Sequence, residues 1–460
     1  MTKPFVAHLI INKHHGERIR GEPHTFTPYK NTFWRNTMFN REQFFTKAQD
    51  TLAKLYAGRD TEGVKARYNA AFDEFEKIFG EADDLSVFSV AGRSEICGNH
   101  TDHNYGKVLA ASIDLDIIAI VKKTDNGTIR MKSKGFDEDV VNINKLAPDM
   151  SETGRSSALI RGVCDGFVKN GHKIGGFEAY TTSDILGGSG LSSSAAFEDM
   201  VGTILNYLYN DGAVDYIELS QISQYAENAH FGKPCGLMDQ VACAAGGFVT
   251  IDFADPKNPI AERIAFDLAK AGYSLCIVNT GGSHANLTDD YAAVPAEMKA
   301  VAKCFGKPVL RGLTEADIIG KAAEIRKTVG DRAILRAIHF IRENARVERM
   351  LIALADGNID GFLSIIKESG NSSATLLQNY YAPKAPEEQG ITLACAIASE
   401  ILGSEGAWRV HGGGFAGTMQ AFVPHAKMEE FRATMEKVFG EGAVTELSVR
   451  PLGAAAVYHG

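Results

Sequence analysis

The sequence predicts an α+β protein built of two lobes. Its 460 residues are more than one ordinary core needs and enough for two packed domains. Apolar runs with strand character alternate with segments whose apolar residues recur at helical spacing. The turn-forming residues at 255–259 are the best candidate for a boundary. We expect an N-terminal extension of unknown role at 1–60, a first lobe at 61–254 and a second lobe at 255–460.

Residues before this boundary are expected to form both helices and strands. Helical spacing covers the segments 41–56, 64–79 and 193–209. Strand patterns cover the segments 87–90, 113–121, 128–131 and 248–253. Gly80 is placed to end the second helix as a C-cap. Asp114 and Asp116 alternate with apolar residues, which predicts a strand with one buried face.

Residues after the boundary show the same two kinds of pattern. Strand patterns cover the segments 273–278, 408–410 and 419–423. Helical spacing covers the segments 290–304, 315–328, 332–356 and 390–402. Thr314 stands three residues before Asp317, which is a weak sign of a capping box.

Composition and charge exclude several classes of protein. The net charge is −9, and no run of Lys and Arg suggests a nucleic-acid-binding face. The N-terminal residues lack the long apolar region of a signal peptide, and no segment approaches the ~20 apolar residues that span a bilayer. The seven cysteines are dispersed without a CxxC pair, as expected of free thiols in a reducing compartment. We therefore expect a cytoplasmic protein that binds neither nucleic acid nor membrane.

A loop rich in glycine and serine at 187–196, GGSGLSSSAA, is the most informative segment. Glycines let the backbone approach a ligand, and the serines begin a predicted helix whose free N–H groups attract phosphate. Hydroxyl groups in this position can also reach a magnesium ion. The alternative is a flexible turn with an N-capping serine, and phosphate binding is favoured because the loop is so dense in Gly and Ser.

Three familiar motifs do not match the sequence of this loop. A P-loop needs a lysine before its Ser or Thr, and the loop has none. A serine-hydrolase elbow needs glycine where Leu191 stands, and a dinucleotide fingerprint needs glycine at Ser193. A second glycine cluster at 412–417 does satisfy GxGxxG, but a strand pattern follows it. We interpret that cluster as a turn near the nucleotide or the substrate.

Two further polar segments suggest chemistry. The segment 92–106 offers Arg, Asn, His and Asp side chains, which suits a ligand with many hydroxyl groups. A metal site at His100, Asp102 and His103 is a weaker alternative, as is a polar turn without function. Further along, glycines and a proline surround Asp239, which is either a turn residue or a candidate base for a hydroxyl nucleophile.

Together these segments resemble the galactokinase branch of the GHMP small-molecule kinases. The motifs that carry the resemblance stand in the family's order: GRSEICGNHTDHNYG, GGSGLSSSAA, GKPCGLMDQVACAAG and HGGGFAG. Weaker similarities lie at 130–133, 339–347 and 369–372, so the resemblance runs from near Glu62 to the C-terminus. It implies a two-lobed fold with an N-terminal mixed α/β lobe, a C-terminal ferredoxin-like α+β lobe and an active site in the cleft between them.

The resemblance also implies roles for particular residues. Asp239 would face the attacking hydroxyl group, and Arg93 would stabilise Asp239 and the transferring phosphoryl group. Ser194 and Glu227 would hold Mg²⁺. The residues expected to contact ATP are Ser133, Gly188, Ser189, Gly190, Leu191, Ser192, Ser193 and Ser194. The residues expected to contact the sugar are Asn99, His100, Thr101, Asp102, Gly236 and Tyr291.

The resemblance leaves the identity of the phosphoryl acceptor open. The family usually has Glu before His-Thr-Asp, where this chain has Asn99, and Glu95 fills a position where the family has Asn. An arginine pair of the family after Tyr291 is also replaced, by the segment AAVP at 292–295. Galactose phosphorylated by ATP at its anomeric hydroxyl group is favoured. An N-acetylhexosamine, another sugar, a polyol, or a non-catalytic sugar-binding regulator are the alternatives, and a monomer is expected.

Overall fold

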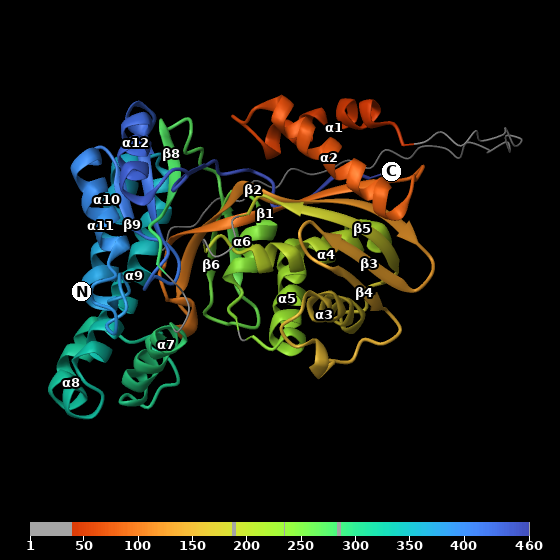
Figure 1. The fold of residues 1–460 in the computed structure, drawn as a ribbon. Helices are drawn as coiled ribbons and strands as arrows, with labels where there is room; N and C mark the ends of the chain where they lie inside the picture. Colours follow the sequence, from red (N-terminus) through yellow and green to blue (C-terminus); the bar gives the residue numbers. More distant parts are fainter. Residues whose placement is uncertain (1–38, 186–189, 234, 283–286, 460) are drawn as a thin grey trace, which may run out of the picture. The chain divides into compact units, whose positions relative to one another are not determined.

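Two β-sheets organise the part of the chain that the computed structural model describes, residues 39–185, 190–233, 235–282 and 287–459 (Figure 1). The first sheet has eight strands and the second has four. The predicted α+β class and its two lobes are confirmed. In these residues no helix is long and apolar enough to cross a membrane.

The first sheet is built around two long strands, β1 (Ser86–Cys97) and β2 (Lys107–Thr124). Its order is β12-β1-β2-β5-β3-β4, and β6 and β7 extend it from the first half of β2. The other strands are β3 (Thr128–Ser133), β4 (Glu138–Asn142), β5 (Gly176–Ser183), β6 (Phe248–Asp252), β7 (Ile260–Ile264) and β12 (Ala454–Tyr458). Only β3 and β5 run parallel; the remaining pairs are antiparallel.

Helices cover both faces of this sheet, which Figure 1 shows as three layers. On one face lie α3 (Ser156–Lys169), α4 (Ser193–Asn210), α5 (Tyr216–Ala226) and α6 (Met238–Ala245). On the other lie α1 (Arg41–Leu55) and α2 (Thr61–Phe79). Neighbouring residues of β1 accordingly face different cores: Phe88 packs with α4, and Val87 packs with the aromatic side chains of α1 and α2.

The polar face of β2 is buried, although the sequence predicts one exposed face. Asp116 is fully buried and accepts hydrogen bonds from Arg67, Arg450 and Tyr56. Arg67 and Tyr56 come from the helical layer of α1 and α2, and Arg450 comes from just before β12. Burial alone would raise the pKa of Asp116, but these guanidinium groups hold it below its ordinary value. Paired in this way, a carboxylate can lie in a core without the cost of an isolated charge.

The second sheet has the order β11-β8-β10-β9, with all neighbours antiparallel. Its strands are β8 (Tyr273–Asn279), β9 (Ala407–Val410), β10 (Thr418–Pro424) and β11 (Val444–Leu447). Helices α10 (Ile359–Ser372), α11 (Gly390–Leu402) and α12 (Met428–Phe439) contact it. Along the chain these strands follow one another as β8, β9, β10 and β11, with helices between β8 and β9 and between β10 and β11. This is the ferredoxin-like β-α-β-β-α-β arrangement that the resemblance implied.

Three more helices complete the second half of the chain and share a core of their own. They are α7 (Thr288–Lys303), α8 (Glu315–Thr328) and α9 (Asp331–Ala355). The capping box predicted at Thr314 and Asp317 is present, with both reciprocal hydrogen bonds formed. The predicted end of α2 at Gly80 is also confirmed, because Gly80 has φ +83° and its N–H donates to the carbonyl of Glu76.

The two sheets do not divide the chain at one point. Residues 255–259 join β6 to its antiparallel neighbour β7, and β12 returns to pair with β1. Two strands from beyond residue 254 therefore lie in the first sheet, and the lobe boundary stays a prediction. Of the predicted extension, residues 39–60 include α1, whose Phe44 and Leu55 are fully buried.

Candidate active site

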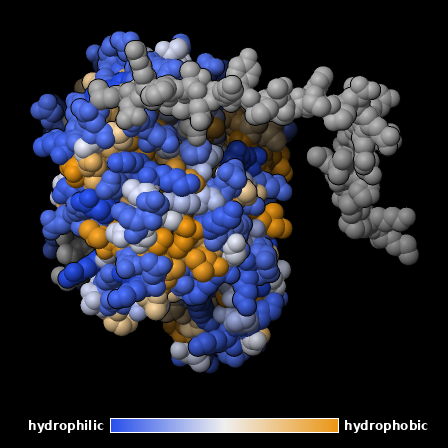
Figure 2. Space-filling view, turned by 90° about the vertical axis from the view of Figure 1, so that its right-hand side faces the viewer, coloured by the Kyte–Doolittle hydropathy of each residue, from blue (hydrophilic) through white to orange (hydrophobic). Residues whose placement is uncertain are grey.

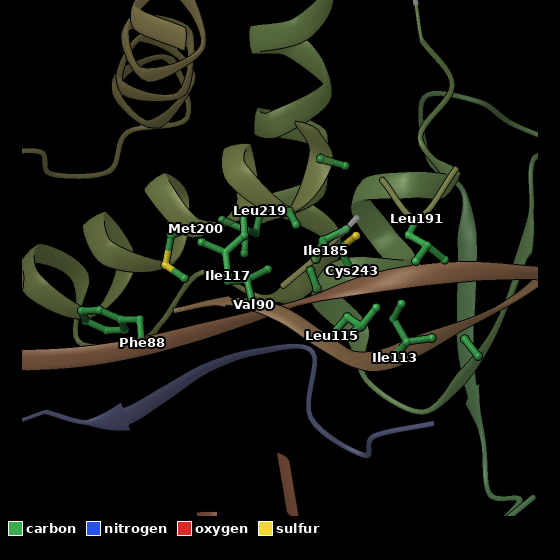
Figure 3. Close-up of a cluster of buried hydrophobic side chains, with 14 of the residues drawn as sticks. Phe88, Val90, Ile113, Leu115, Ile117, Ile185, Leu191, Met200, Leu219 and Cys243 are labelled. Carbon is green, nitrogen blue, oxygen red and sulfur yellow. The ribbon is translucent and has the colours of Figure 1, made fainter. Parts of the chain in front are cut away.

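The described part of the glycine-serine loop leads directly into α4, which confirms the prediction that its serines begin a helix. Gly188 and Ser189 lie outside the described residues. From Gly190 onward the loop is tied to β1, because Arg93 N–H donates to the carbonyl of Leu191 at 3.1 Å. The Leu191 side chain is buried in the first core together with Cys243 of α6 (Figure 3). One hydrophobic cluster therefore fixes both the loop and the helix that carries Asp239.

Ser192 has an unusual conformation that redirects its hydroxyl group. It precedes α4 with φ 61° and ψ 53°, in the left-handed region that costs a residue other than glycine about 1–2 kcal/mol. Its hydroxyl group caps no backbone N–H of α4 and instead donates to Asp239 Oδ2 at 2.5 Å. The exposed residues Ser193 and Ser194 then begin the helix, and N–H groups in the first turn of a helix lack partners within it and can bind an anion.

Asp239 and Arg93, the two predicted catalytic residues, form an ion pair. Arg93 donates to Asp239 Oδ1 from Nε at 2.9 Å and lies 2.8 Å from it through its second terminal nitrogen. Another terminal N–H of Arg93 donates to the carbonyl of Gly190. Arg93 is buried, whereas 37% of the Asp239 side chain is exposed. The arginine is thus held in place, and the carboxylate faces outward.

The charge state of Asp239 follows from these partners. Burial raises the pKa of a carboxyl group, but Arg93 and the Ser192 hydroxyl group outweigh this effect and hold the pKa of Asp239 below its ordinary value. Asp239 is therefore ionised at neutral pH and can accept a hydrogen bond, or a proton, from a bound hydroxyl group.

Glu227, one of the two predicted metal ligands, lies in a π-helical turn that follows α5, η3 (Glu227–Phe231). π-Helical turns are rare and are frequent at functional sites. Glu227 Oε1 accepts from Lys233 Nζ at 2.9 Å, and Oε2 accepts from the Gln240 amide at 3.0 Å. The same Gln240 nitrogen donates to Glu198 Oε2 at 3.1 Å, so one amide joins two carboxyl groups.

Glu198 adds a second buried carboxyl group to this cluster. Its side chain is fully buried, and Oε1 has no hydrogen-bond partner among the described residues. Burial and the neighbouring Glu227 raise the pKa of Glu198 to about 10. Glu198 lies one helical turn after Ser194, on the same face of α4.

These residues fit a hard cation. Carboxylate and hydroxyl oxygens are the ligands that Mg²⁺ prefers, and it is commonly held by one or two carboxylates together with substrate phosphates. Glu227 supplies a carboxylate, Ser194 a hydroxyl group beside the phosphate loop, and Glu198 an oxygen that no protein donor satisfies. Within the described ranges, no group of three or more His, Cys, Asp or Glu side chains is arranged to hold a metal by itself. The weaker candidate at His100, Asp102 and His103 is therefore not such a group.

A cavity of about 980 Å³ opens beside the loop. Ser133, Ser193 and Ser194 line it, together with apolar side chains that include Phe197 and Phe231. The hydroxyl group of Ser133 accepts from Thr181 at 2.8 Å. Three of the predicted ATP contacts therefore share one cavity, bounded by β3, β4, β5 and the starts of α3 and α4. On the side of the molecule where β3 and β4 lie, apolar patches interrupt a largely hydrophilic surface (Figure 2).

The segment 98–106 meets the residues just before α6. A Cβ atom placed on Gly236 would lie 2.6 Å from Asp102 Oδ2, so only glycine leaves room for this carboxylate. His100 Nε2 lies 3.0 Å from the carbonyl of Gly413, and the Tyr291 hydroxyl group donates to the carbonyl of Gly414 at 2.9 Å. The late glycine-rich turn thus holds two predicted sugar contacts through its backbone carbonyls, and its Phe415 ring also packs edge-on against Tyr291.

Asn99 and Thr101, two other predicted sugar contacts, are fully buried. The Asn99 amide group donates to Glu95 and to the carbonyl of Gly412 at 2.7 Å, and its Oδ1 accepts from Asn379 at 2.9 Å. The Thr101 hydroxyl group lies within hydrogen-bond distance of two backbone carbonyls. Direct sugar contact by these two side chains stays a prediction that the observed contacts do not support.

A buried charge network, which no sequence motif predicted, anchors the same segment to the second half of the chain. Glu343 of α9 accepts from the N–H of Gly98 at 3.0 Å and from Arg346 at 2.7 Å. Arg409 of β9 donates to Glu95 at 2.8 Å and to the carbonyl of Ile96 at 2.6 Å. The only sequence signal was the weak similarity at 339–347, which contains Glu343.

Gly236→Ala is expected to raise the KM for the sugar about tenfold or more, with little change in stability. The added methyl group displaces the Asp102 carboxylate, and a lost charge-assisted hydrogen bond to a ligand costs about 1.5–3 kcal/mol. Steady-state kinetics measures the effect. Gly320→Ala is the matched control, because a Cβ there meets nothing within 4 Å. An unchanged sugar KM in Gly236→Ala would contradict the placement of Asp102 at the sugar.

His100 is expected to make the protein less stable as the pH falls. Burial and the nearby His103 lower the pKa of His100 to about 4, although the Gly413 carbonyl and Asp102 favour its charged form. Between its unfolded value of about 6.5 and pH 4, the unfolded chain binds a proton that the native state does not. The free energy of unfolding therefore falls through this window, by at most about 1.4 kcal/mol per pH unit for this group. Urea unfolding at pH 7 and pH 5 should show a smaller difference in His100→Gln than in the wild type, and equal differences would refute this role.

Comparison with known proteins agrees with this geometry. Residues 73–123 match the galactokinase galactose-binding signature, and residues 158–247 match the N-terminal domain of GHMP kinases. The galactokinase of Streptomyces coelicolor is 30% identical over 378 residues, covering 80% of this chain and 92% of that protein. The galactokinase of Glaesserella parasuis is 30% identical over 367 residues, covering 78% and 90%.

Solved structures show the same architecture. Lactococcus lactis galactokinase, crystallised with galactose, superposes with a TM-score of 0.72 at 23% identity, covering 84% of this chain and 99% of that one. Methanococcus jannaschii mevalonate kinase superposes with a TM-score of 0.56 at 14% identity, covering 79% and 98%. The fold is therefore that of the GHMP kinases. Within that class, the chain belongs to the galactokinase family of ATP-dependent sugar kinases.

Proposed function

We propose that this protein phosphorylates galactose at the anomeric hydroxyl group, using ATP and Mg²⁺, to give galactose 1-phosphate and ADP. The observation that carries the proposal is the position of Asp239. Its ionised, partly exposed carboxylate is fixed by Arg93 and by Ser192 of the glycine-serine loop, and Asp102 lies against Gly236, three residues before it. An acceptor hydroxyl group and a terminal phosphate can meet at this carboxylate.

In the proposed reaction, the anomeric oxygen attacks the γ-phosphorus and the bond to the β-phosphate oxygen breaks, so that ADP leaves. Asp239 orients the hydroxyl group and receives its proton. Arg93 keeps Asp239 ionised and places positive charge beside the transferring group. The free N–H groups at the start of α4 bind the phosphates. Mg²⁺, when bound, neutralises phosphate charge, and Ser194 and Glu227 would hold it.

His100, Asp102, Tyr291 and the Gly236 backbone would bind the sugar. We infer that Asn99 and Thr101 support this site indirectly, since both side chains are buried in hydrogen bonds to the protein. Ser133, Ser193 and Ser194, which line the cavity beside the loop, would contact ATP. Contacts of ATP with Gly190, Leu191 and Ser192 stay expectations. We also propose that the protein is cytoplasmic, since its seven cysteines are free, as thiols are in a reducing compartment. A monomer stays the expected oligomeric state.

A coupled assay of ADP release tests the proposal. Purified protein should consume ATP in the presence of Mg²⁺ and galactose, and EDTA should abolish the reaction. Running the same assay with C2 and C6 derivatives of galactose, with N-acetylhexosamines and with polyols identifies the acceptor. Turnover of another compound alone would replace galactose as the substrate. Sugar and ATP binding without ADP release would instead favour a non-catalytic regulator.

A further inference from the structure

Lys233 is a cation at the edge of the candidate site, and the sequence motifs assign it no role. It lies in the short turn between η3 and α6, six residues before Asp239. We propose that Lys233 is a phosphate-binding residue, which leaves Glu227 and contacts the terminal phosphates of ATP when Mg²⁺ and nucleotide bind. This inference rests on the proposed function, because it assigns an additional residue to the same phosphoryl transfer.

The two partners of the Lys233–Glu227 pair differ in freedom. Glu227 has only 4% of its side chain exposed and is fixed from the other side by Gln240. The Lys233 side chain is 61% exposed and ends in the 2.9 Å contact with Glu227. A lysine ammonium on a flexible four-carbon chain can change partners at low cost, whereas the buried carboxylate cannot follow it.

Acidic groups surround Lys233. Its ammonium group donates to Glu227 at 2.9 Å, and Gln240 joins Glu227 to Glu198. A lysine is protonated at neutral pH, so Lys233 brings a positive charge to this group of carboxyl side chains.

A Mg²⁺ ion held by Glu227 would compete with a protein donor for one of its oxygens. Both oxygens of Glu227 have protein donors, Lys233 on Oε1 and Gln240 on Oε2. A cation held by Glu227 and Ser194 would displace the ammonium group rather than the Gln240 amide, because Gln240 is buried and is also bound to Glu198. The displaced ammonium group would then lie beside the most concentrated negative charge of the complex, the phosphates at the start of α4.

This exchange supplies what the loop itself lacks. In P-loop proteins a lysine within the loop contacts the β- and γ-phosphates, acting as a point charge. The segment 187–196 contains no lysine. Lys233, carried by a different segment and paired with Glu227, would provide the equivalent charge.

The test compares the binding of ATP, ADP and AMP to Lys233→Met by calorimetry in the presence of Mg²⁺. The loss of one charge-assisted contact should weaken ATP about tenfold or more, weaken ADP less and leave AMP unchanged. kcat should fall as well, and Lys233→Arg should recover part of both losses. Lys270→Met is the matched control, because that side chain is 87% exposed and pairs only with nearby Asp267 at the surface.

The outcomes separate this inference from the proposed function. An equal loss for all three nucleotides, or no loss for ATP, would overturn the role of Lys233 while the wild type still turned over sugar. A wild type that turns over no acceptor would overturn the proposed function, and the nucleotide series would still report on Lys233. Urea unfolding of each variant checks that the fold is retained.

Discussion

Asp239→Asn is expected to lower kcat for sugar phosphorylation about a thousandfold and to leave nucleotide binding nearly unchanged. Positioned general bases contribute about 10²–10⁴-fold, and the amide cannot take the proton of the acceptor hydroxyl group. The fold should persist, since the amide oxygen can still accept from Arg93 while its NH₂ group donates to the Ser192 oxygen. ADP release measures turnover, and calorimetry measures ATP binding.

Asp331→Asn is the matched control for this change. It is the same substitution at an exposed position, where the ion pair with Arg326 contributes little. Activity near that of the wild type in Asp239→Asn would show that another group faces the hydroxyl. A loss of ATP affinity as large as the loss of kcat would instead place Asp239 in nucleotide binding.

Glu343→Ala is expected to destabilise the protein by about 3–5 kcal/mol, the usual cost of removing one partner of a buried ion pair. Burial raises the pKa of a carboxyl group, but Arg346, His339 and Arg409 hold the pKa of Glu343 well below its ordinary range. Its removal leaves Arg346 buried without its 2.7 Å partner and frees the N–H of Gly98. The segment that carries His100 and Asp102 then loses its anchor, so the sugar KM should rise as well.

Guanidinium chloride unfolding and sugar kinetics measure the two effects. Glu348→Ala, on the same helix, is the control, because that carboxylate is more than half exposed and its pair with Lys107 should be worth less than about 1 kcal/mol. Wild-type stability in Glu343→Ala would show that the network does not hold the segment.

Local patterns predicted part of the secondary structure and missed the rest, including α3, α5, α10, β5 and β12. The helices α4 and α8 and the strands β8 and β10 begin within a residue of their predicted positions, because hydrophobic periodicity and capping are local properties. β2 shows where such reasoning stops. The alternation around Asp116 was correct, but its polar face is covered by helices and neutralised by Arg67 and Arg450, which no pattern within the strand reveals.

The site depended even more on distant residues. Arg93 and Asp239 are separated by 146 positions, and only the resemblance brought them together before the structure did. The contact of Ser192 with Asp239 requires a left-handed backbone, which a serine gives no sign of in sequence. Glu198 and Lys233 were missed because each looks like an ordinary charged residue until its neighbours are known.

The pairing of β12 with β1 has a consequence for how the protein is made. Ser86 and His459, which lie within hydrogen-bond distance across this edge, are 373 residues apart. During translation β1 waits with an open edge until almost all of the described chain has left the ribosome, and unpaired edges of this kind invite aggregation. Gly453 also packs directly on the backbone at the end of α6, the helix that carries Asp239. A nascent chain should therefore need chaperone protection for most of its synthesis. A truncated product that lacks β12 should fail to complete the first sheet and should not act as a kinase.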